Sequence, residues 1–293
     1  MDYFTDYAEE MNIKCALNTR VRHADRIDGQ WQIKTEQGTH SCDHLVIATG
    51  KTNIPRMVEK PGLESFRGSV IHSAEYKNGE SYANKDVLVI GFGNSAGEIA
   101  ICLHEHGARP ALSVRSGVNI VPRDILGLSA LAVGAATNAL PPHLADKLNK
   151  PIVDLIIGDV RKLGFKKLPY GPKEQITKYG QIPLLDIGTV DLIRKGFIQV
   201  FDDVEKITGN IIHFKNGKEQ HFDHIIMGTG YETGLEQIID IDEARYEDML
   251  RAPNKRQLLG KDNLYFSGYF VSPGGTLTTV GQDAEVISSV ILG

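Results

Sequence analysis

A turn with two glycines, set between an apolar strand and an amphipathic helix, constrains this chain more than any other feature. The segment KDVLVIGFGNSAGEIAICLHEHG predicts a strand over 87–90, a tight turn, and a helix over 95–106. In such a unit the first two glycines let the backbone approach a pyrophosphate, and the helix N-terminus adds free amides and a positive dipole. The third position serves helix–strand packing and accepts alanine. The predicted nucleotide-binding residues are Gly91, Phe92, Gly93, Asn94, Ser95 and Ala96.

A second strand, ARPALSV, follows the helix, and its presence favours a dinucleotide site over an ordinary tight strand–helix connection. This strand ends in Arg115 and Ser116, where NAD-specific domains carry an acidic residue for the ribose 2′-hydroxyl. An arginine there suits a 2′-phosphate, so the predicted nucleotide is NADP. Arg123, in VPRD, is a second candidate for the same contact. A surface arginine at a strand end is the alternative interpretation of Arg115.

Two segments of the chain, 29–50 and 209–230, resemble each other. Each has alternating strand residues, a glycine turn, a second short strand, and then Asp-His followed by an apolar strand that closes in Thr-Gly. The nearly continuous apolar runs suit strands buried on both faces of a parallel sheet. The alternating pieces before them predict three-stranded meanders.

The second copy closes the unit that opens with the strand at Val87. By analogy, the first copy should close a unit with its own strand, glycine turn and helix, but the residues before Asp43 contain no such opener. Instead, MDYFTDYAEEMNI predicts an amphipathic helix and KCALNTRVRHADRI predicts strands. The sequence therefore predicts a chain that begins within a domain.

The composition is that of a globular protein and excludes several classes of partner. Hydrophobic residues make up 41% of the 293 residues and charged residues 24%, a balance typical of soluble domains. A net charge of −5 argues against nucleic acid and against a polybasic membrane contact. Cys15, Cys42 and Cys102 lack CxxC spacing, which favours free thiols in a reducing cytoplasm. The longest uncharged stretch, from Ile125, is too rich in small and polar residues for a membrane span.

The stretch FRGSVIHSAEY, just ahead of the glycine turn, places Phe66, Gly68, His72 and Tyr76 in the spacing FxGxxxHxxxY. With this fingerprint stand, in order, CDHLVIATG, GFGNSAGE, VPRD, LLDIG, MGTGY and LYFSGYFVSPGGTLTTVGQDAEVI. On these motifs the whole chain resembles flavin-containing monooxygenases, of the bacterial and YUCCA-type plant branch. In that family the fingerprint links two nucleotide domains, and Baeyer–Villiger relatives carry tryptophan where Tyr76 stands. A core histidine with a satisfied hydrogen bond is the other interpretation of His72.

The resemblance implies an oxidoreductase that uses NADPH and FAD to oxygenate a small organic substrate with O2. In the family, NADPH reduces FAD, reduced flavin and oxygen form a C4a-hydroperoxide, and the substrate attacks it. The protein supplies binding, orientation and exclusion of water, and no catalytic side chain is assigned. No metal is implied, because His104 and His106 would point apart on their helix. The residues that match positions near the cofactors in relatives are Gly50, Gly230 and the Gly281–Asp283 loop.

One part of the family pattern has no counterpart in this chain: the N-terminal FAD turn, a GxGxxG motif. Three interpretations are open. The chain is a fragment or split gene product of a monooxygenase, or a second chain contributes the FAD half, or the protein is a paralogue that kept NADP and lost FAD. The last interpretation predicts a catalytically inactive or regulatory NADP-binding module.

The predicted fold is α/β, with a Rossmann-like NADP-binding domain inserted into a truncated FAD-binding domain. Residues 85–230 form the NADP-binding domain, with a helical insertion at about 124–185. Residues 1–84 and 231–293 form a partial FAD-binding domain that is discontinuous in sequence. The missing first strand predicts an exposed sheet edge. Such edges are commonly covered by another chain, so we expect a homodimer or a chain that supplies the FAD half.

Overall fold

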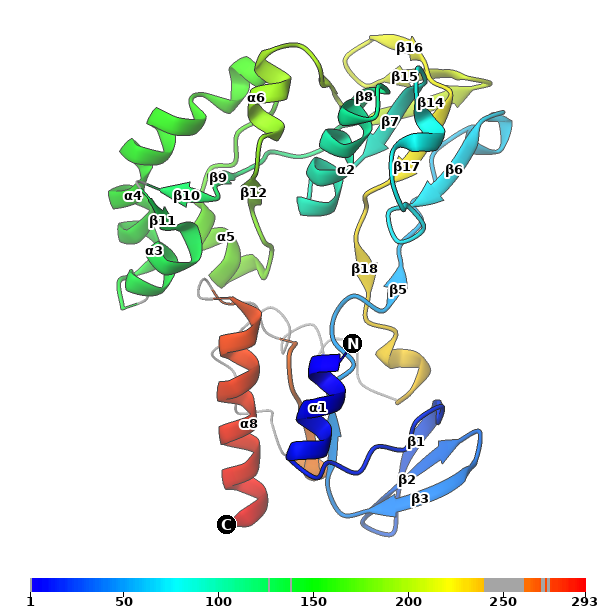
Figure 1. The fold of residues 1–293 in the computed structure, drawn as a ribbon, viewed down its shortest axis with the longest axis vertical. Helices are drawn as coiled ribbons and strands as arrows, with labels where there is room; N and C mark the ends of the chain where they lie inside the picture. The colour runs from blue at the N-terminus through cyan, green and yellow to red at the C-terminus, as the bar shows by residue number, and fades with distance from the viewer. Residues whose placement is uncertain (1, 126, 138, 240–260, 270–271, 273–274) are drawn as a thin grey trace.

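The protein consists of two bodies that lie one above the other along the long axis of the molecule (Figure 1). The computed structural model describes residues 2–125, 127–137, 139–239, 261–269, 272 and 275–293. Two chain segments connect the bodies, and they pair as short antiparallel strands, β5 (Ile54–Pro55) and β18 (Tyr231–Glu232). The upper body contains the glycine turn, and the lower body contains the first and last helices.

A five-stranded parallel sheet forms the centre of the upper body. Its strand order, β13-β8-β7-β17-β6, places the strand that precedes the glycine turn in the middle. Every pair of neighbouring strands in it is parallel. The strands are β6 (Ser69–His72), β7 (Asp86–Ile90), β8 (Arg109–Ser113), β13 (Gln199–Phe201) and β17 (His224–Met227).

Both faces of this sheet are covered, which explains the continuous apolar runs in its strands. Val87 and Val89 of β7 pack in one buried cluster with helices α2 and α6, whereas Leu88 and Ile90 pack in another with an antiparallel meander, β14–β15–β16. Because side chains alternate across a strand, β7 must be apolar throughout to fill both layers. The covering elements are α2 (Asn94–Glu105), α6 (Thr189–Arg194), β14 (Val204–Thr208), β15 (Ile211–Phe214) and β16 (Glu219–His221).

A helical lobe lies beside this sheet, on the left of Figure 1, within the segment where the sequence predicts an insertion. Its helices α4 and α5 both begin with proline, which suits a position whose amide would have no intrahelical acceptor. In the described ranges, no helix is both long and apolar enough to cross a bilayer. The elements of the lobe are β9 (Ile120–Pro122), β10 (Asp124–Ile125), β11 (Leu128–Ser129), α3 (Ala130–Ala136), α4 (Pro142–Ile157), α5 (Pro172–Tyr179) and β12 (Leu184–Asp186).

The lower body joins segments from both ends of the chain. Strand β4 runs parallel to β19, the indole N–H of Trp31 donates to the Asp262 carbonyl at 2.9 Å, and the Ala24 N–H donates to the Ile238 carbonyl at 2.7 Å. Its elements are α1 (Asp2–Glu10), β1 (Val21–Ile27), β2 (Gln30–Thr35), β3 (Gly38–Cys42), β4 (Leu45–Ile47), β19 (Leu264–Phe266) and α8 (Thr276–Leu292). Short 3-10 turns lie at Leu63–Ser65, Glu80–Tyr82, Val160–Leu163, Leu235–Gln237 and Lys261–Asn263.

Both copies of the sequence repeat form the predicted meander followed by a short parallel strand. The first copy supplies β2, β3 and β4, and the second supplies β15, β16 and β17. Strand β17 is central in the large sheet, whereas β4 pairs with β19 alone within the part of the chain that the structure describes. Among the described residues no strand pairs with the other edge of β4, and Val46 on β4 is 42% exposed.

One predicted boundary is wrong, because the upper body begins well before residue 85. Strand β6 pairs with β17 as the edge of the five-stranded sheet. Further upstream, the Lys60 ammonium lies 2.6 Å from an Asp203 carboxylate oxygen, and the Ile207 N–H donates to the Pro61 carbonyl at 2.8 Å. The sequence gives no local signal for these contacts, since the partners lie far apart in the chain.

Gly68 is the position in this sheet where a side chain would be most disruptive. A Cβ atom added to Gly68 would lie 1.8 Å from the Asp223 carbonyl oxygen, whereas one added to Gly93 would meet no atom within 4 Å. We expect Gly68→Ala to lower the free energy of unfolding by about 1–3 kcal/mol, because β6 must move off its neighbour. Gly93→Ala is the matched control and should unfold like the wild type. Thermal denaturation followed by circular dichroism measures both, and equal midpoints for the two variants would contradict this packing.

Candidate nucleotide and substrate site

The first glycine of the turn is fixed by a close approach of two backbones. Gly91 has a φ of 124°, and a Cβ there would lie 2.2 Å from the Gly228 carbonyl oxygen. The Gly91 N–H donates to the Ser113 carbonyl at 3.0 Å, and the Gly228 N–H donates to the Ile90 carbonyl at 2.8 Å. These contacts hold together the carboxyl ends of β7, β8 and β17. They thereby fix the path of the backbone from the end of β7 into the turn.

The second glycine opens the space that a pyrophosphate needs. Gly93 is exposed, caps the N-terminus of α2 and has open space around its Cα. The first amides of a helix have no intrahelical acceptors, so those of Asn94, Ser95 and Ala96 can bind an anion here. Ala96 itself is fully buried, and a Cβ on Gly228 would lie 2.9 Å from the Ala96 Cβ. The third position therefore serves helix–strand packing, as the pattern predicts.

Two other residues of the turn attach it to the helical lobe. The ring of Phe92 packs on that of Phe165, with centroids 4.4 Å apart. The side-chain oxygen of Asn94 accepts a hydrogen bond from the Leu185 N–H at 2.8 Å. Phe92 thus acts in packing, and Asn94 connects the turn to β12.

Arg115 follows the end of β8, at the same edge of the sheet where the glycine turn follows the end of β7. Ile90 pairs with Ser113 in register, and Arg115 and Ser116 are exposed just beyond β8. Within the described residues Arg115 makes no ion pair, so its guanidinium can meet a phosphate. Arg123 lies instead at the end of β9, in the separate β12–β9 sheet, and its Nε is 2.9 Å from an Asp124 carboxylate oxygen. This ion pair makes Arg123 the poorer candidate.

The fingerprint histidine is a buried connector between the two bodies. His72 is 1% exposed, its Nε2 lies 2.9 Å from the Gly230 carbonyl oxygen, and its Nδ1 accepts from the Ala74 N–H at 3.1 Å. One tautomer, with the proton on Nε2, satisfies both contacts. The interpretation as a core histidine with satisfied hydrogen bonds therefore describes His72 correctly. Its partner Gly230 is one of the glycines expected near a cofactor.

The other fingerprint residues act in packing. Phe66 packs against the cluster under the meander, and Tyr76 packs against the cluster under α2. Burial raises the pKa of the Tyr76 phenol, so this group stays neutral at physiological pH. The fingerprint thus marks a structural junction rather than reacting groups.

Of the residues predicted near a flavin, two are open glycines and one is a buried carboxylate. Gly50 has a φ of 75° and Gly230 a φ of 81°, and a Cβ on either would meet no atom within 4 Å. Asp283 is fully buried, and its carboxylate accepts a hydrogen bond from the Gly268 N–H at 3.1 Å.

The predicted loop at 281–283 is wrong, because these residues lie inside helix α8. The prediction rested on the family resemblance; Gly281 faces solvent in the helix and has open space around it. Asp283 lies two residues later in the same helix. Its side chain points into the lower body, where it accepts a hydrogen bond from Gly268 in the turn after β19.

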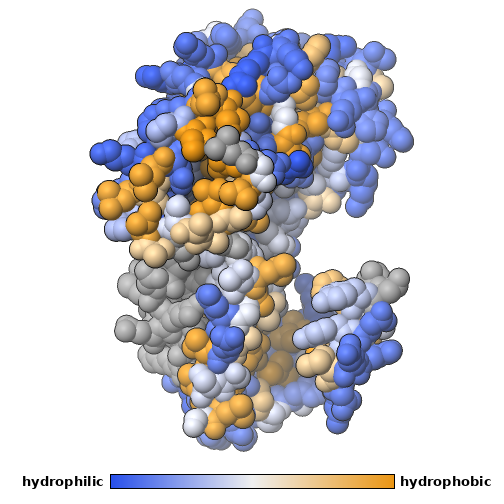
Figure 2. Space-filling view, turned by 60° about the vertical axis from the view of Figure 1, so that its left-hand side comes forward, coloured by the Kyte–Doolittle hydropathy of each residue, from blue (hydrophilic) through white to orange (hydrophobic). Residues whose placement is uncertain are grey.

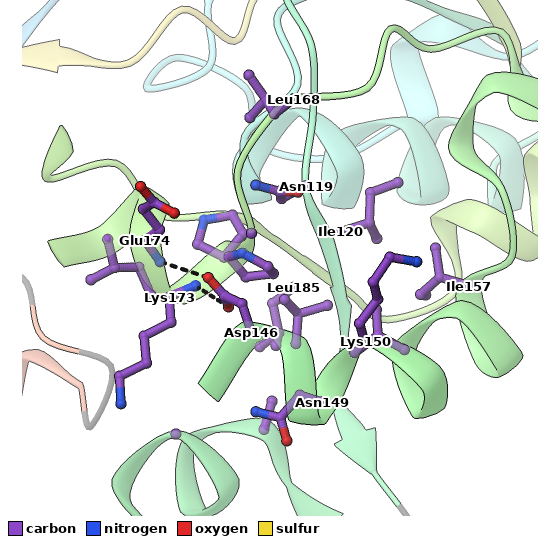
Figure 3. A pocket seen from close by; sticks show the side chains of 18 of the residues that line it. Asn119, Ile120, Asp146, Asn149, Lys150, Ile157, Leu168, Lys173, Glu174 and Leu185 are labelled. Atoms are coloured by element: carbon purple, nitrogen blue, oxygen red, sulfur yellow. Dashed lines mark hydrogen bonds between the residues drawn. The ribbon is translucent and has the colours of Figure 1, made fainter. Parts of the chain in front are cut away.

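A cavity of about 620 Å³ lies within the helical lobe, between its helices and the β9–β12 pair (Figure 3). Asn94 of the nucleotide turn and Thr276 at the start of α8 both line it. Its walls are largely apolar, and this volume falls within the range of small-molecule sites. The apolar lining residues include Ile120, Ile125, Val153, Ile157, Leu168 and Leu185.

The polar groups around the cavity hold the lobe together. Figure 3 shows the Asp146 carboxylate between α4 and the start of α5, where it accepts hydrogen bonds from the backbone N–H groups of Lys173 (2.9 Å) and Glu174 (3.0 Å). The Lys173 ammonium donates to the carbonyls of Thr137 and Leu140, and burial lowers the pKa of Lys173. Sequence reasoning missed these residues, because the carboxylate that caps α5 comes from another helix.

Known proteins with similar sequences and folds identify the family. The sequence model described as "Flavin-binding monooxygenase-like" matches residues 1–245. The chain is 36% identical to the probable indole-3-pyruvate monooxygenases YUCCA4 and YUCCA1 of Arabidopsis thaliana, over 92% and 98% of its length. The chain belongs to the flavin-binding monooxygenase-like family. It spans 66% of the length of the first relative and 70% of the second.

Solved structures of flavin monooxygenases share the fold. The flavin-containing monooxygenase from Stenotrophomonas maltophilia superposes with a TM-score of 0.66 at 17% identity, covering 99% of this chain and 75% of that one. The complex of OTEMO with FAD and NADP superposes with a TM-score of 0.69 at 18% identity, covering 99% and 69%. The predicted fold, α/β with a Rossmann-like domain inserted in a truncated form of the two-domain flavoprotein fold, is therefore confirmed.

The His72 contacts give a direct test of the junction in this family member. We expect His72→Phe to lower the free energy of unfolding by about 0.5–1.5 kcal/mol for each of the two hydrogen bonds lost, the one to the Gly230 carbonyl and the one from the Ala74 N–H. His40→Phe, an exposed site on β3, is the control and should change stability little. Chemical denaturation of the three proteins measures the difference. A His72→Phe variant as stable as the His40→Phe control would contradict the assigned contacts.

Proposed function

We propose that this protein is an NADPH- and FAD-dependent monooxygenase that oxygenates a small, largely apolar organic molecule with O2. One observation carries the proposal: the nucleotide turn and the apolar cavity share a wall at Asn94. A nicotinamide nucleotide held at the turn would therefore reach the chamber that receives the substrate. The relatives named as indole-3-pyruvate monooxygenases make an aromatic 2-oxo acid the first substrate to test.

NADP would be held by the turn and by the end of the next strand. The open face of Gly93 and the amides of Asn94 to Ala96 receive the pyrophosphate. Arg115 supplies a charge-assisted contact to the 2′-phosphate, and Ser116 adds a hydroxyl beside it.

FAD would lie where the two bodies meet, against Gly50 and Gly230. Both glycines have left-handed backbone and open space, which lets a planar ring system approach the main chain. When bound, the flavin supplies the redox and oxygen chemistry. His72 holds Gly230 in place, and Asp283 holds the segment after β19.

The residues of the cavity have a passive role in this proposal. The apolar walls around Ile120, Val153 and Leu185 exclude water from the substrate. The ammonium of Lys173 and the carboxylate of Asp146 are engaged in holding α3, α4 and α5, so no proton transfer is assigned to them. We place this activity in the cytosol, a location supported by the three free cysteines. We assign residues from about Lys60 to Gly230 to the NADP-binding domain, because Lys60 already contacts Asp203 of the upper body.

A second candidate is a regulatory NADP-binding module without flavin chemistry. It is favoured by one observation: the cradle of Gly91, Gly93 and Arg115 is built entirely by the upper body. Nucleotide binding would then need nothing from the lower body.

Arg115 should decide the choice between the two nicotinamide nucleotides. We expect Arg115→Ala to weaken NADPH binding about ten- to a hundredfold, the cost of losing a hydrogen bond to a charged partner, and to leave NADH binding nearly unchanged. Arg123→Ala is the matched control. Gly93→Val should abolish binding of both nucleotides by filling the pyrophosphate space. Calorimetric titration measures all four proteins, and equal wild-type affinity for NADH and NADPH would refute the assignment.

Flavin binding separates the two candidate functions. We expect the purified protein, mixed with FAD and desalted, to retain a visible flavin absorption band that NADPH bleaches under anaerobic conditions. Gly50→Val should reduce flavin retention while calorimetry shows unchanged NADPH binding, because Gly50 lies in the lower body. Tight NADPH binding with no flavin retained would support the regulatory module instead.

A further inference from the structure

Two side-chain amides line the apolar cavity of the helical lobe, and the protein fixes the direction of one of them. Asn119 lies just before β9 and Asn149 lies on α4, and Figure 3 labels both. Figure 2 shows that apolar side chains also gather on the outside of this lobe, which the view brings forward. In apolar surroundings of this kind, a few placed polar groups decide which ligand binds and how it is oriented.

Both hydrogens of the Asn119 amide are used by the protein. Its Nδ2 donates to the Tyr170 carbonyl at 3.0 Å and to the Gln175 side-chain oxygen at 2.8 Å. Gln175 is 7% exposed, so this partner lies in the interior of the lobe. A primary amide carries two hydrogens on its nitrogen and two lone pairs on its oxygen. The two contacts therefore direct the nitrogen toward α5 and leave the oxygen, Oδ1, as the group that still needs a partner.

The Oδ1 atom of Asn119 opens to the cavity. In the part of the chain that the structure describes, no donor reaches Oδ1, yet this atom is not sealed from solvent. The neighbours Val118 and Ile120 are buried, whereas Asn119 is half-buried and lines the cavity. The accessible side of Asn119 is therefore the side that a ligand in the cavity would meet.

The backbone of Asn119 is connected to the nucleotide turn. The Leu184 N–H donates to the Asn119 main-chain carbonyl at 3.1 Å, and the Leu185 N–H donates to the Asn94 side chain at 2.8 Å. Two successive amides of β12 thus join the residue that carries the acceptor to the first residue of α2. A ligand bonded to Oδ1 would be held at a set place relative to the turn.

The other polar groups of the cavity are less constrained. Asn149 is half-buried, and within the described ranges its amide makes no hydrogen bond, so it can turn to suit water or a ligand. Lys147 and Lys167 also line the cavity, but both are exposed and keep water as a partner. Oδ1 of Asn119 differs from these groups because its direction is set before any ligand binds.

We propose that Asn119 selects ligands that carry a hydrogen-bond donor, an N–H or O–H group, on a largely apolar body. This inference rests on the proposed function, in which the cavity receives the substrate. The donor satisfies Oδ1, whereas an analogue of the same shape without the donor leaves Oδ1 unpaired inside an apolar chamber. Sites built around such a hydrogen bond reject the analogue that lacks it.

Indole and benzofuran test this selection, because the two molecules have nearly the same shape and only indole carries an N–H. We expect calorimetric titration of the wild type to show an affinity for indole at least about fivefold higher than for benzofuran. Asn119→Ala should bind both equally. Gln175→Met removes one acceptor of Nδ2 and should reduce the preference, since the amide is then held less firmly. Asn149→Ala is the matched control and should keep the preference.

The titration of the wild type needs no variant to fold. Equal affinities for indole and benzofuran, or binding of neither, would overturn the inference. A preference that Asn149→Ala removes and Asn119→Ala keeps would also overturn it. The proposed function fails by a different result, because the titration contains no nucleotide. A protein that prefers indole but binds neither NADPH nor FAD would retain the Asn119 selection and lose the monooxygenase assignment.

Discussion

The close approach of Gly91 to Gly228 is the constraint on which the rest of the upper body depends. A φ of 124° and a distance of 2.2 Å from an added Cβ to the Gly228 carbonyl leave room for no other residue at position 91. The hydrogen bonds from Gly91 to Ser113 and from Gly228 to Ile90 then hold three strand ends together. The direction of α2, the open face of Gly93 and the position of Arg115 all follow from this arrangement.

A second set of contacts connects the two bodies beside Gly230, where we propose that FAD lies. The Gly230 carbonyl accepts hydrogen bonds from His72 Nε2 at 2.9 Å and from the Arg56 N–H at 3.0 Å. The Arg56 guanidinium also donates to the Thr229 carbonyl at 2.7 Å. The crossing strands β5 and β18 are only two residues long each, so these side-chain contacts carry much of the connection. The buried His72 thus holds the backbone of Gly230, the glycine against which we propose that FAD lies.

The helical lobe shows how an apolar chamber is built without reacting side chains. Two of its ionised groups are used internally: Asp146 caps α5, and the Lys173 ammonium donates to the carbonyls of Thr137 and Leu140 between α3 and α4. What remains on the cavity wall is mainly aliphatic. This arrangement suits chemistry in which a bound cofactor reacts and the protein excludes water. The same helix α4 presents its charged side to the cavity rim and its exposed leucines to the outside.

The sequence by itself determined the features that depend on neighbouring residues. The glycine turn, the meanders of the repeat and the buried apolar strands were predictable, because period-two alternation and Gly spacing are local signals. The tertiary structure alone decided that β6 joins the upper sheet, that Phe92 packs on Phe165, and that Asp283 sits inside a helix. The tertiary structure also formed the cavity and placed the Asp146 carboxylate of α4 at the N-terminus of α5. These features depend on contacts between segments far apart in the chain, and no local pattern of residues specifies which distant partner will fill a given space.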